Sequence, residues 1–168
     1  MGGPHSVTPV DQIEVWVEAY GREIHAYLWR TLGDLRDAED CLQETFLRAL
    51  GSRSRASIRQ PRAWLYAIAT NTARSQLRRR GKERAERTSL ETDIAEPGDA
   101  EWRDRLEAVR RAVEALPAKQ RQALLLRRYQ GLSYPEVARV LGGSPQAARA
   151  NVYQAVLKLK KAFPEEAR

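Results

Sequence analysis

The chain has 168 residues, of which 42% are hydrophobic and 30% are charged, and its formal net charge is +7. These values fit one large or two small globular domains, and the excess of positive charge favours a polyanionic partner. A single cysteine and two histidines exclude an intrachain disulfide and a structural zinc site, and no apolar run or signal pattern indicates a membrane segment, so the sequence predicts a soluble, cytoplasmic protein without a cofactor.

The charges fall into four blocks. Net charge is −5 over residues 1–50, +9 over 51–90, −5 over 91–107 and +8 over 108–168. Two basic regions separated by an acidic segment are typical of a protein that grips nucleic acid at two places, and clustering of ordinary solvated helix faces is the alternative. Alternating β-branched runs are missing, so we expect an all-α fold of two small helical domains joined by a flexible acidic linker. The expected parts are a disordered leader over 1–10, a helical domain over 11–80, the linker over 81–105 and a second domain over 106–165.

The first two helices are predicted over 11–32 and 35–50, separated by Gly33. The second helix is expected to bury Ala38, Cys41, Leu42, Thr45, Phe46 and Ala49. Its opposite face carries Asp40, Gln43, Glu44 and Leu47. An exposed leucine ringed by polar groups points to a protein partner, whereas a solvated face with one exposed leucine is the alternative.

A basic loop and a third helix follow. The loop GSRSRASIRQ, residues 51–60, combines serines with guanidinium groups that suit phosphates or an unstacked base. The helix is predicted over 61–80, and its outer side carries an amide and several arginines in line, a pattern that suits single-stranded DNA. The candidate DNA-binding residues of this region are Arg53, Arg55, Ser57, Arg62, Asn71, Arg74, Arg78 and Arg79. The alternative for Arg78–Arg80 is that they compensate the negative end of the helix dipole.

Four further helices are predicted after the linker, which makes the second domain a four-helix unit. A helix from Arg105 to Leu116 has an apolar face with Leu106 and Val109. A helix over 119–130 is expected to bury Ala123, Leu124, one of Leu125 and Leu126, and Tyr129. A short helix and a second helix after it then make up the most informative part of the sequence.

The stretch LSYPEVARVLGGSPQAARANVYQAVLKLKK, residues 132–161, carries two helix starts around a glycine turn. Ser133 and Glu136 form a capping box, Gly142 ends the first helix, and Ser144 caps a second helix with Pro145 at its first position. This pattern predicts a DNA-binding helix-turn-helix, and an ordinary helical hairpin is the alternative. The candidate DNA-binding residues of the second helix are Ser144, Gln146, Ala147, Arg149, Ala150, Asn151, Tyr153, Gln154 and Lys158.

Motifs for catalysis are missing from the sequence. It contains no Gly-rich phosphate loop, no paired histidine and carboxylate, and no nucleophile with a base at a usable spacing. Cys41 falls on the inward face of its helix, where a small core residue is expected. We therefore expect that the protein is not an enzyme.

Three stretches resemble the sigma-70 family of bacterial RNA polymerase initiation factors, in particular its small two-domain extracytoplasmic-function (ECF) group. They are DAEDCLQETFLRAL (37–50), PRAWLYAIATNTARSQLRRR (61–80) and LPAKQRQALLLRRYQGLSYPEVARVLG (116–142), and the likeness covers about residues 11–163. The resemblance implies a transcription initiation factor that binds core RNA polymerase, directs it to specific promoters and helps to melt the −10 element. The implied partners are the clamp helices of the largest polymerase subunit, the flap region, duplex and single-stranded promoter DNA, and an anti-sigma protein, with no membrane.

The same resemblance assigns roles to particular residues. The contact with the clamp helices falls on Asp40, Gln43, Glu44 and Leu47. The loop 51–60 corresponds to the family's loop that holds a flipped base, Asn71 and Arg74 face the melted strand, the acidic linker threads the RNA exit channel, and 144–158 corresponds to the helix that reads the −35 element. We expect the polymerase to hold the two domains apart on the promoter.

The recognition helix departs from the family pattern. Asn151 and Gln154 stand where arginines are usual, and Ala147 and Ala150 stand where hydroxyl residues are usual. Fewer phosphate contacts would weaken binding and flatten its salt dependence, while Gln146, Asn151 and Gln154 suit adenine edges. The alternative function is a stand-alone helix-turn-helix regulator, which predicts a dimerisation surface and palindromic half-sites and leaves the acidic face and arginine loop unexplained.

Overall fold

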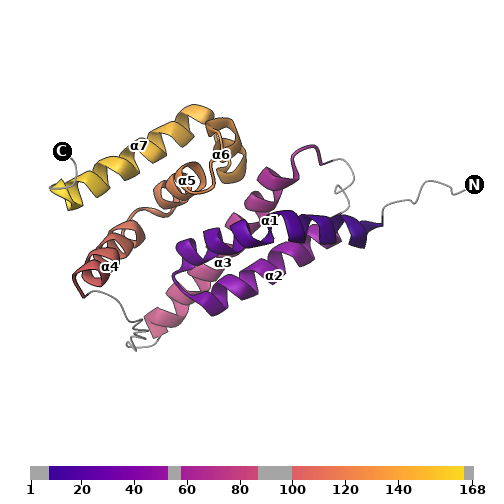
Figure 1. Ribbon diagram of the computed structural model, residues 1–168, viewed down its shortest axis with the longest axis horizontal. Coiled ribbons are helices and arrows are strands. Elements are labelled where there is room, and N and C mark those ends of the chain that lie inside the picture. The colour runs from indigo at the N-terminus through magenta and orange to yellow at the C-terminus, as the bar shows by residue number, and fades with distance from the viewer. Residues whose placement is uncertain (1–7, 53–57, 87–99, 165–168) are drawn as a thin grey trace, which may run out of the picture.

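The computed structural model describes residues 8–52, 58–86 and 100–164, and these parts of the chain form α-helices and no strand (Figure 1). The helices are α1 (Pro9–Leu32), α2 (Leu35–Gly51), α3 (Pro61–Glu86), α4 (Ala100–Glu114), α5 (Ala118–Arg128), α6 (Tyr134–Leu141) and α7 (Pro145–Ala162). The all-α, two-domain prediction is confirmed, with α1–α3 in the first domain and α4–α7 in the second. In the described ranges, no helix combines the length and apolar character that a membrane span requires.

Side-chain caps fix where most of these helices begin. Thr8 and Asp11 form a capping box at the start of α1, and Asp34 accepts a hydrogen bond from the backbone N–H of Asp37 at the start of α2. Ser133 and Glu136 form the predicted capping box of α6, and their hydrogen bonds hold the pKa of the Glu136 carboxyl below its ordinary value. Each cap satisfies backbone donors that a helix start otherwise leaves unpaired.

The core of the first domain is built around two tyrosines. The ring of Tyr27 packs edge-on against the ring of Tyr66, with centroids 5.4 Å apart, and Ile24 and Leu65 of the same core are also buried. The Tyr27 hydroxyl is 2.8 Å from Oγ1 of Thr70, so the buried phenol keeps a hydrogen-bond partner. Burial raises the pKa of Tyr27 to about 12. These contacts bring α1 and α3 together, and α2 packs on both.

The second domain packs α5, α6 and α7 around Leu126, Val137 and Val152, all buried. Helix α4 lies at its edge, and its expected apolar face is covered only toward the C-terminal end: Leu116, which follows the helix, is buried and Val113 is half-buried, whereas Leu106 is 57% exposed and Val109 is also exposed. The expectation that Tyr129 is buried is wrong as well. It lies at the end of α5, 61% exposed, because the chain turns there toward Gly131.

Three helices begin or end at other residues than the sequence predicted. Helix α1 begins inside the expected leader, because Thr8 caps it and Pro9 fits its first turn. Helix α3 continues six residues past the expected end at Arg80 and passes through Gly81, a residue that weakens a helix without forbidding it. Helix α4 begins at Ala100, inside the expected linker 81–105. The remainder of that linker, 87–99, lies outside the described residues.

The two domains pack against each other, although we expected them to act apart. In Figure 1 the helices α5 and α6 lie beside α1 and α3, and contacts join α3 to α6 and α1 to α5. We call this contact region the seam. Its hydrogen bonds run from Arg62 Nη2 to the Gln130 carbonyl (2.6 Å), from the Tyr66 hydroxyl to Gln130 Oε1 (2.9 Å), from Arg74 Nε to Gln122 Oε1 (3.0 Å), and from Arg139 to Gln60. The guanidinium of Arg30 also lies 4.9 Å from the centroid of the Tyr129 ring.

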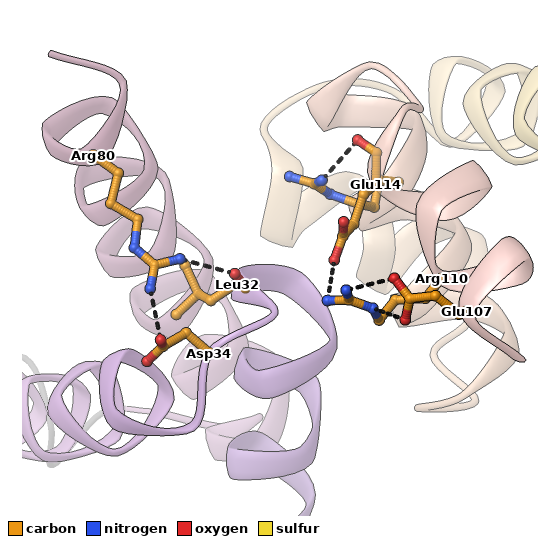
Figure 2. A network of polar contacts seen from close by, with 7 residues as sticks. Leu32, Asp34, Arg80, Glu107, Arg110 and Glu114 are labelled. Atoms are coloured by element: carbon orange, nitrogen blue, oxygen red, sulfur yellow. Dashed lines mark hydrogen bonds and ion pairs between the residues drawn. The ribbon is translucent and has the colours of Figure 1, made fainter. Parts of the chain in front are cut away.

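The turn between α1 and α2 is touched from both domains (Figure 2). Gly33 adopts φ +70°, a conformation that favours glycine, and ends α1. From α3, Arg80 donates a hydrogen bond to the Leu32 carbonyl and pairs with Asp34. From α4, the Glu114 carboxylate comes so close that a Cβ at Gly33 would lie 2.9 Å from its Oε1.

Candidate functional site

The outer face of α2 is presented to solvent. Asp40 and Gln43 are exposed, Glu44 is half-buried, and the side chain of Leu47 is 62% exposed. Glu44 accepts a hydrogen bond from Arg48 one turn along the helix, at 2.6 Å. The opposite face of α2 fills the core with Ala38, Cys41, Thr45, Phe46 and Ala49, while Leu42, expected to be buried with them, is half-buried. The structure therefore brings the four predicted residues together on one accessible surface, which we call the α2 face.

The single cysteine of the chain lies behind this face. The Cys41 side chain is only 3% exposed, and burial, reinforced by Asp37 and Asp40, raises the pKa of its thiol to about 11. At neutral pH the thiol is therefore protonated and a poor nucleophile. Cys41 acts as a core residue, and its carbonyl accepts a hydrogen bond from Thr45 Oγ1 at 2.6 Å.

The predicted DNA-binding loop is only partly described. Arg53, Arg55 and Ser57 lie outside the described residues. Arg59 and Gln60 are exposed at the end of the loop, where Gln60 accepts the hydrogen bond from Arg139 of α6. A shallow groove at this point is lined by Arg59, Ala63, Trp64 and Ala67 on one side and by Arg139 on the other.

Arg62, at the first turn of α3, is held within the protein. Its Nε and Nη2 donate to the two carboxylate oxygens of Glu23, at 2.7 and 2.9 Å, and Nη2 also reaches the Gln130 carbonyl. The bonds to Glu23 raise the pKa of this guanidinium above its ordinary value. A two-pronged pair of this kind is strong and directional, so Arg62 fixes α3 to α1 and to the seam.

Further along α3, two predicted strand-facing residues have different surroundings. Asn71 is exposed, whereas Arg74 is half-buried and donates to Gln122 Oε1 across the seam. The second domain thus binds Arg74 and leaves Asn71 accessible. The predicted DNA-binding side of α3 is therefore partly covered by the second domain.

The three arginines at positions 78–80 of α3 also differ in their surroundings. Arg78 and Arg79 are exposed, and Arg78 donates to Ser75 Oγ at 3.2 Å. Arg80 instead pairs with Asp34 and Asp37 at the start of α2. The dipole alternative is therefore not needed for Arg80, because carboxylates more than forty residues earlier in the chain hold it.

The helix-turn-helix is formed by α6 and α7, as the sequence predicted. Gly142 takes φ +69° between them, and Ser144 caps α7 by accepting from the backbone N–H of Ala147 at 3.1 Å. Most predicted DNA-binding residues of α7 are exposed: Ser144, Gln146, Ala147, Arg149, Ala150, Tyr153, Gln154 and Lys158. Asn151 is the exception, because it is half-buried and its amide nitrogen donates to the carbonyl of Ala147 at 2.9 Å.

Sequence reasoning missed the residues of the seam. Tyr66, Gln122 and Gln130 are buried, and each makes a hydrogen bond to the other domain. A glutamine inside the apolar face of α5, at Gln122, is the one local signal for such a contact, because a buried amide needs a polar partner. Nothing in the pattern names that partner.

Known proteins resemble this arrangement over most of its length. Residues 16–83 match the family model for Sigma-70 region 2, and residues 106–159 match the one for Sigma-70, region 4. The chain belongs to the sigma-70 family. It is 34% identical over 161 residues to the RNA polymerase sigma factor YlaC of Bacillus subtilis, covering 90% of this chain and 91% of that protein. It is 35% identical over 146 residues to the ECF RNA polymerase sigma factor SigC of Mycobacterium tuberculosis, covering 83% and 78%. These likenesses place it in the ECF group.

A solved structure shares the fold. The sigma factor RpoE of Bartonella quintana, crystallised with the anti-sigma factor NepR, aligns with a TM-score of 0.72 at 24% identity, over 92% of this chain and 98% of that one. At this identity the likeness bears on the fold alone. Region 2 therefore corresponds to α1–α3, and region 4 to the part of the second domain that ends in the helix-turn-helix.

Proposed function

We propose that this sigma factor binds bacterial core RNA polymerase through the α2 face and directs it to promoters in the cytoplasm. The observation that carries this proposal is the pairing, in one chain, of an accessible acidic face around Leu47 with a helix-turn-helix whose recognition helix is exposed. An exposed leucine among carboxylates suits a protein partner with an apolar and basic surface. The protein contributes recognition and no catalysis of its own.

The DNA contacts are divided between the domains. In α3, Asn71, Arg74, Arg78 and Arg79 contact the melted −10 strand, together with Arg53, Arg55 and Ser57 of the loop. The exposed face of α7 reads the −35 element as a duplex. Melting is favoured because an unstacked base gains contacts in the first domain that offset the few kcal/mol lost on unstacking.

The contacts of the seam suggest the order in which polymerase binding and DNA binding occur. Arg74 is engaged with Gln122, so the second domain must leave α3 before that arginine can reach DNA. Polymerase binding at the α2 face does not require this movement, because the face is uncovered. We therefore propose that polymerase binds first and that the domains separate afterwards.

The decisive experiment combines the purified protein with core polymerase on templates that carry random promoter sequences, followed by sequencing of the transcripts. The expected result is a set of start sites that share one −35 and one −10 element. Light scattering and DNA binding of the free protein supply the control. A dimer that binds palindromic DNA tightly without polymerase would favour the stand-alone regulator, which the family matches do not favour.

A further inference from the structure

Tyr134 is a residue that the predicted site left out. It is the first residue of α6, directly after the cap Ser133, and its side chain is half-buried. Two guanidinium groups lie over its ring, that of Arg127 at 5.0 Å and that of Arg149 at 5.2 Å from the ring centroid. Both distances are within the range of a cation–π contact. One aromatic ring thus joins the end of α5 to the recognition helix α7.

The two arginines differ in their freedom to move. Arg127 is half-buried, and its Nη1 donates to the carbonyl of Leu132 at 3.1 Å, so it is fixed to the turn before α6. Arg149 is exposed, and among the described residues its guanidinium has the Tyr134 ring as a partner but no hydrogen bond or ion pair. All five of its N–H groups are therefore available to a ligand.

Arg149 also stands where DNA is expected to pass. It lines a shallow groove on α7 with Gln146, Ala150 and Tyr153. Asn151, one of the three residues that we expected to suit adenine edges, donates its amide N–H to the carbonyl of Ala147. Arg149 is thus the charged side chain of this groove, and an arginine fork matches the O6 and N7 atoms of guanine in the major groove.

We propose that Tyr134 is a positioning residue for promoter readout: its ring holds the Arg149 guanidinium at the groove of α7, where it reads one guanine of the −35 duplex. The inference rests on the proposed function and deepens it. A free arginine loses much rotamer freedom when it binds, and an arginine already stacked on a ring loses less. Arg127, itself fixed, holds the ring in place from α5.

The test uses holoenzyme and the promoter found by transcript sequencing, with each −35 base pair replaced in turn. Arg149→Ala is expected to lower discrimination at one G·C pair by about 5- to 150-fold, the range for a two-pronged arginine–guanine contact. Tyr134→Leu is expected to lower discrimination at that same pair by about two- to fivefold. Tyr134→Phe keeps the ring and is expected to retain the wild-type preference.

A double-mutant cycle separates positioning from a structural role, because a ratio between two promoters cancels a uniform loss of affinity or of folded protein. In the Arg149→Ala background, Tyr134→Leu is expected to leave the base preference unchanged. The proposal is overturned if Tyr134→Leu acts equally in both backgrounds, if Tyr134→Phe behaves like Tyr134→Leu, or if Arg149→Ala weakens all sequences equally, as a phosphate contact would. Failure of the holoenzyme to initiate at all would instead overturn the proposed function.

Discussion

The outer faces of α2 and α3 belong to one small domain, yet their surroundings differ. On α2, Asp40 and Leu47 face solvent, and Glu44 pairs with Arg48 of its own helix. On α3, Arg62 and Arg74 reach across the seam to backbone and side-chain oxygens of the second domain. The outer face of α2 is therefore accessible to a partner, whereas the outer face of α3 becomes fully accessible only after the second domain moves away. If the proposed roles of these faces are right, the free chain can bind polymerase through α2 without a domain movement but cannot use Arg74 of α3 without one.

Charge reversal on α2 is expected to have the largest effect. Asp40→Arg or Glu44→Arg would place like charges against a basic partner surface, at a cost of about 3 kcal/mol or more, which is roughly a 100-fold loss of affinity for core polymerase. The fold should survive, because Asp40 is exposed and the half-exposed surface pair Glu44–Arg48 is worth only about 0.3–0.5 kcal/mol. Holoenzyme assembly measured by co-purification checks this.

Glu18→Arg on α1 is the matched control, because Glu18 is exposed and the charge change is the same. Normal assembly by this variant and loss of assembly by both α2 variants would confirm the α2 face. Normal assembly by all three would show that polymerase binds elsewhere.

Opening the seam is expected to have the next largest effect. Gln130→Ala removes the acceptor of the buried Tyr66 hydroxyl, and leaving that hydroxyl unpaired should weaken the packing of the domains by about 1–3 kcal/mol. The radius of gyration measured by small-angle scattering should rise, and binding of a single-stranded −10 oligonucleotide by the free protein should improve. Gln154→Ala, on the exposed side of α7, should leave the radius of gyration unchanged. An unchanged radius for Gln130→Ala would mean that the seam does not depend on this contact.

Asn71 and Arg74 allow an exposed residue of α3 to be compared with one that is bound across the seam. Asn71→Ala should slow promoter opening about 2- to 10-fold, the value of one hydrogen bond, without changing the shape of the free protein. Arg74→Ala should affect both, because Arg74 also binds Gln122. Promoter opening followed by permanganate footprinting, together with scattering of the free chain, measures the two effects. Equal loss of initial docking and of opening would contradict a role in melting.

The smallest effect concerns the inward side of α2. The folded-state pKa of Cys41 is about 11, above the ordinary value of 9.0, so the unfolded thiol ionises first as pH rises. Its contribution to stability is complete below pH 9 and is lost as pH rises toward 11. Urea unfolding across this range should show a falling free energy of unfolding. Cys41→Ala should reduce that slope and leave the part due to Tyr27, which titrates higher. An unchanged slope would show that the thiol is not responsible.

Much of the fold was predictable because its signals are local. Gly33, the Ser133–Glu136 capping box and the Ser144–Pro145 start act within one helical turn, and the structure places each where the sequence did. The errors arise where the composition of a segment gives the wrong local signal. Helix α4 begins among charged residues that resemble a linker, and α3 runs through Gly81.

The candidate surfaces show the same difference between local and long-range signals. The α2 face was predictable because helical periodicity alone separates Leu47 from the buried side of its helix. The seam was not, because Gln122 and Gln130 lie 48 and 64 residues from their partners and no periodic pattern reports such a distance. Tyr134 was missed for a similar reason, since its significance depends on two arginines contributed by different helices.

The absence of a side chain at Gly33 lets residues of two other helices approach the turn between α1 and α2. Because no side chain stands there, the carboxylate of Glu114 can approach the turn that precedes α2, while Arg80 binds the same turn through the Leu32 carbonyl and Asp34. The turn before α2 is therefore a place where α3 and α4 both meet the first domain's helix α1. An added methyl group at this point would displace the end of the Glu114 side chain, and it would also strain the backbone, because Gly33 has φ +70°.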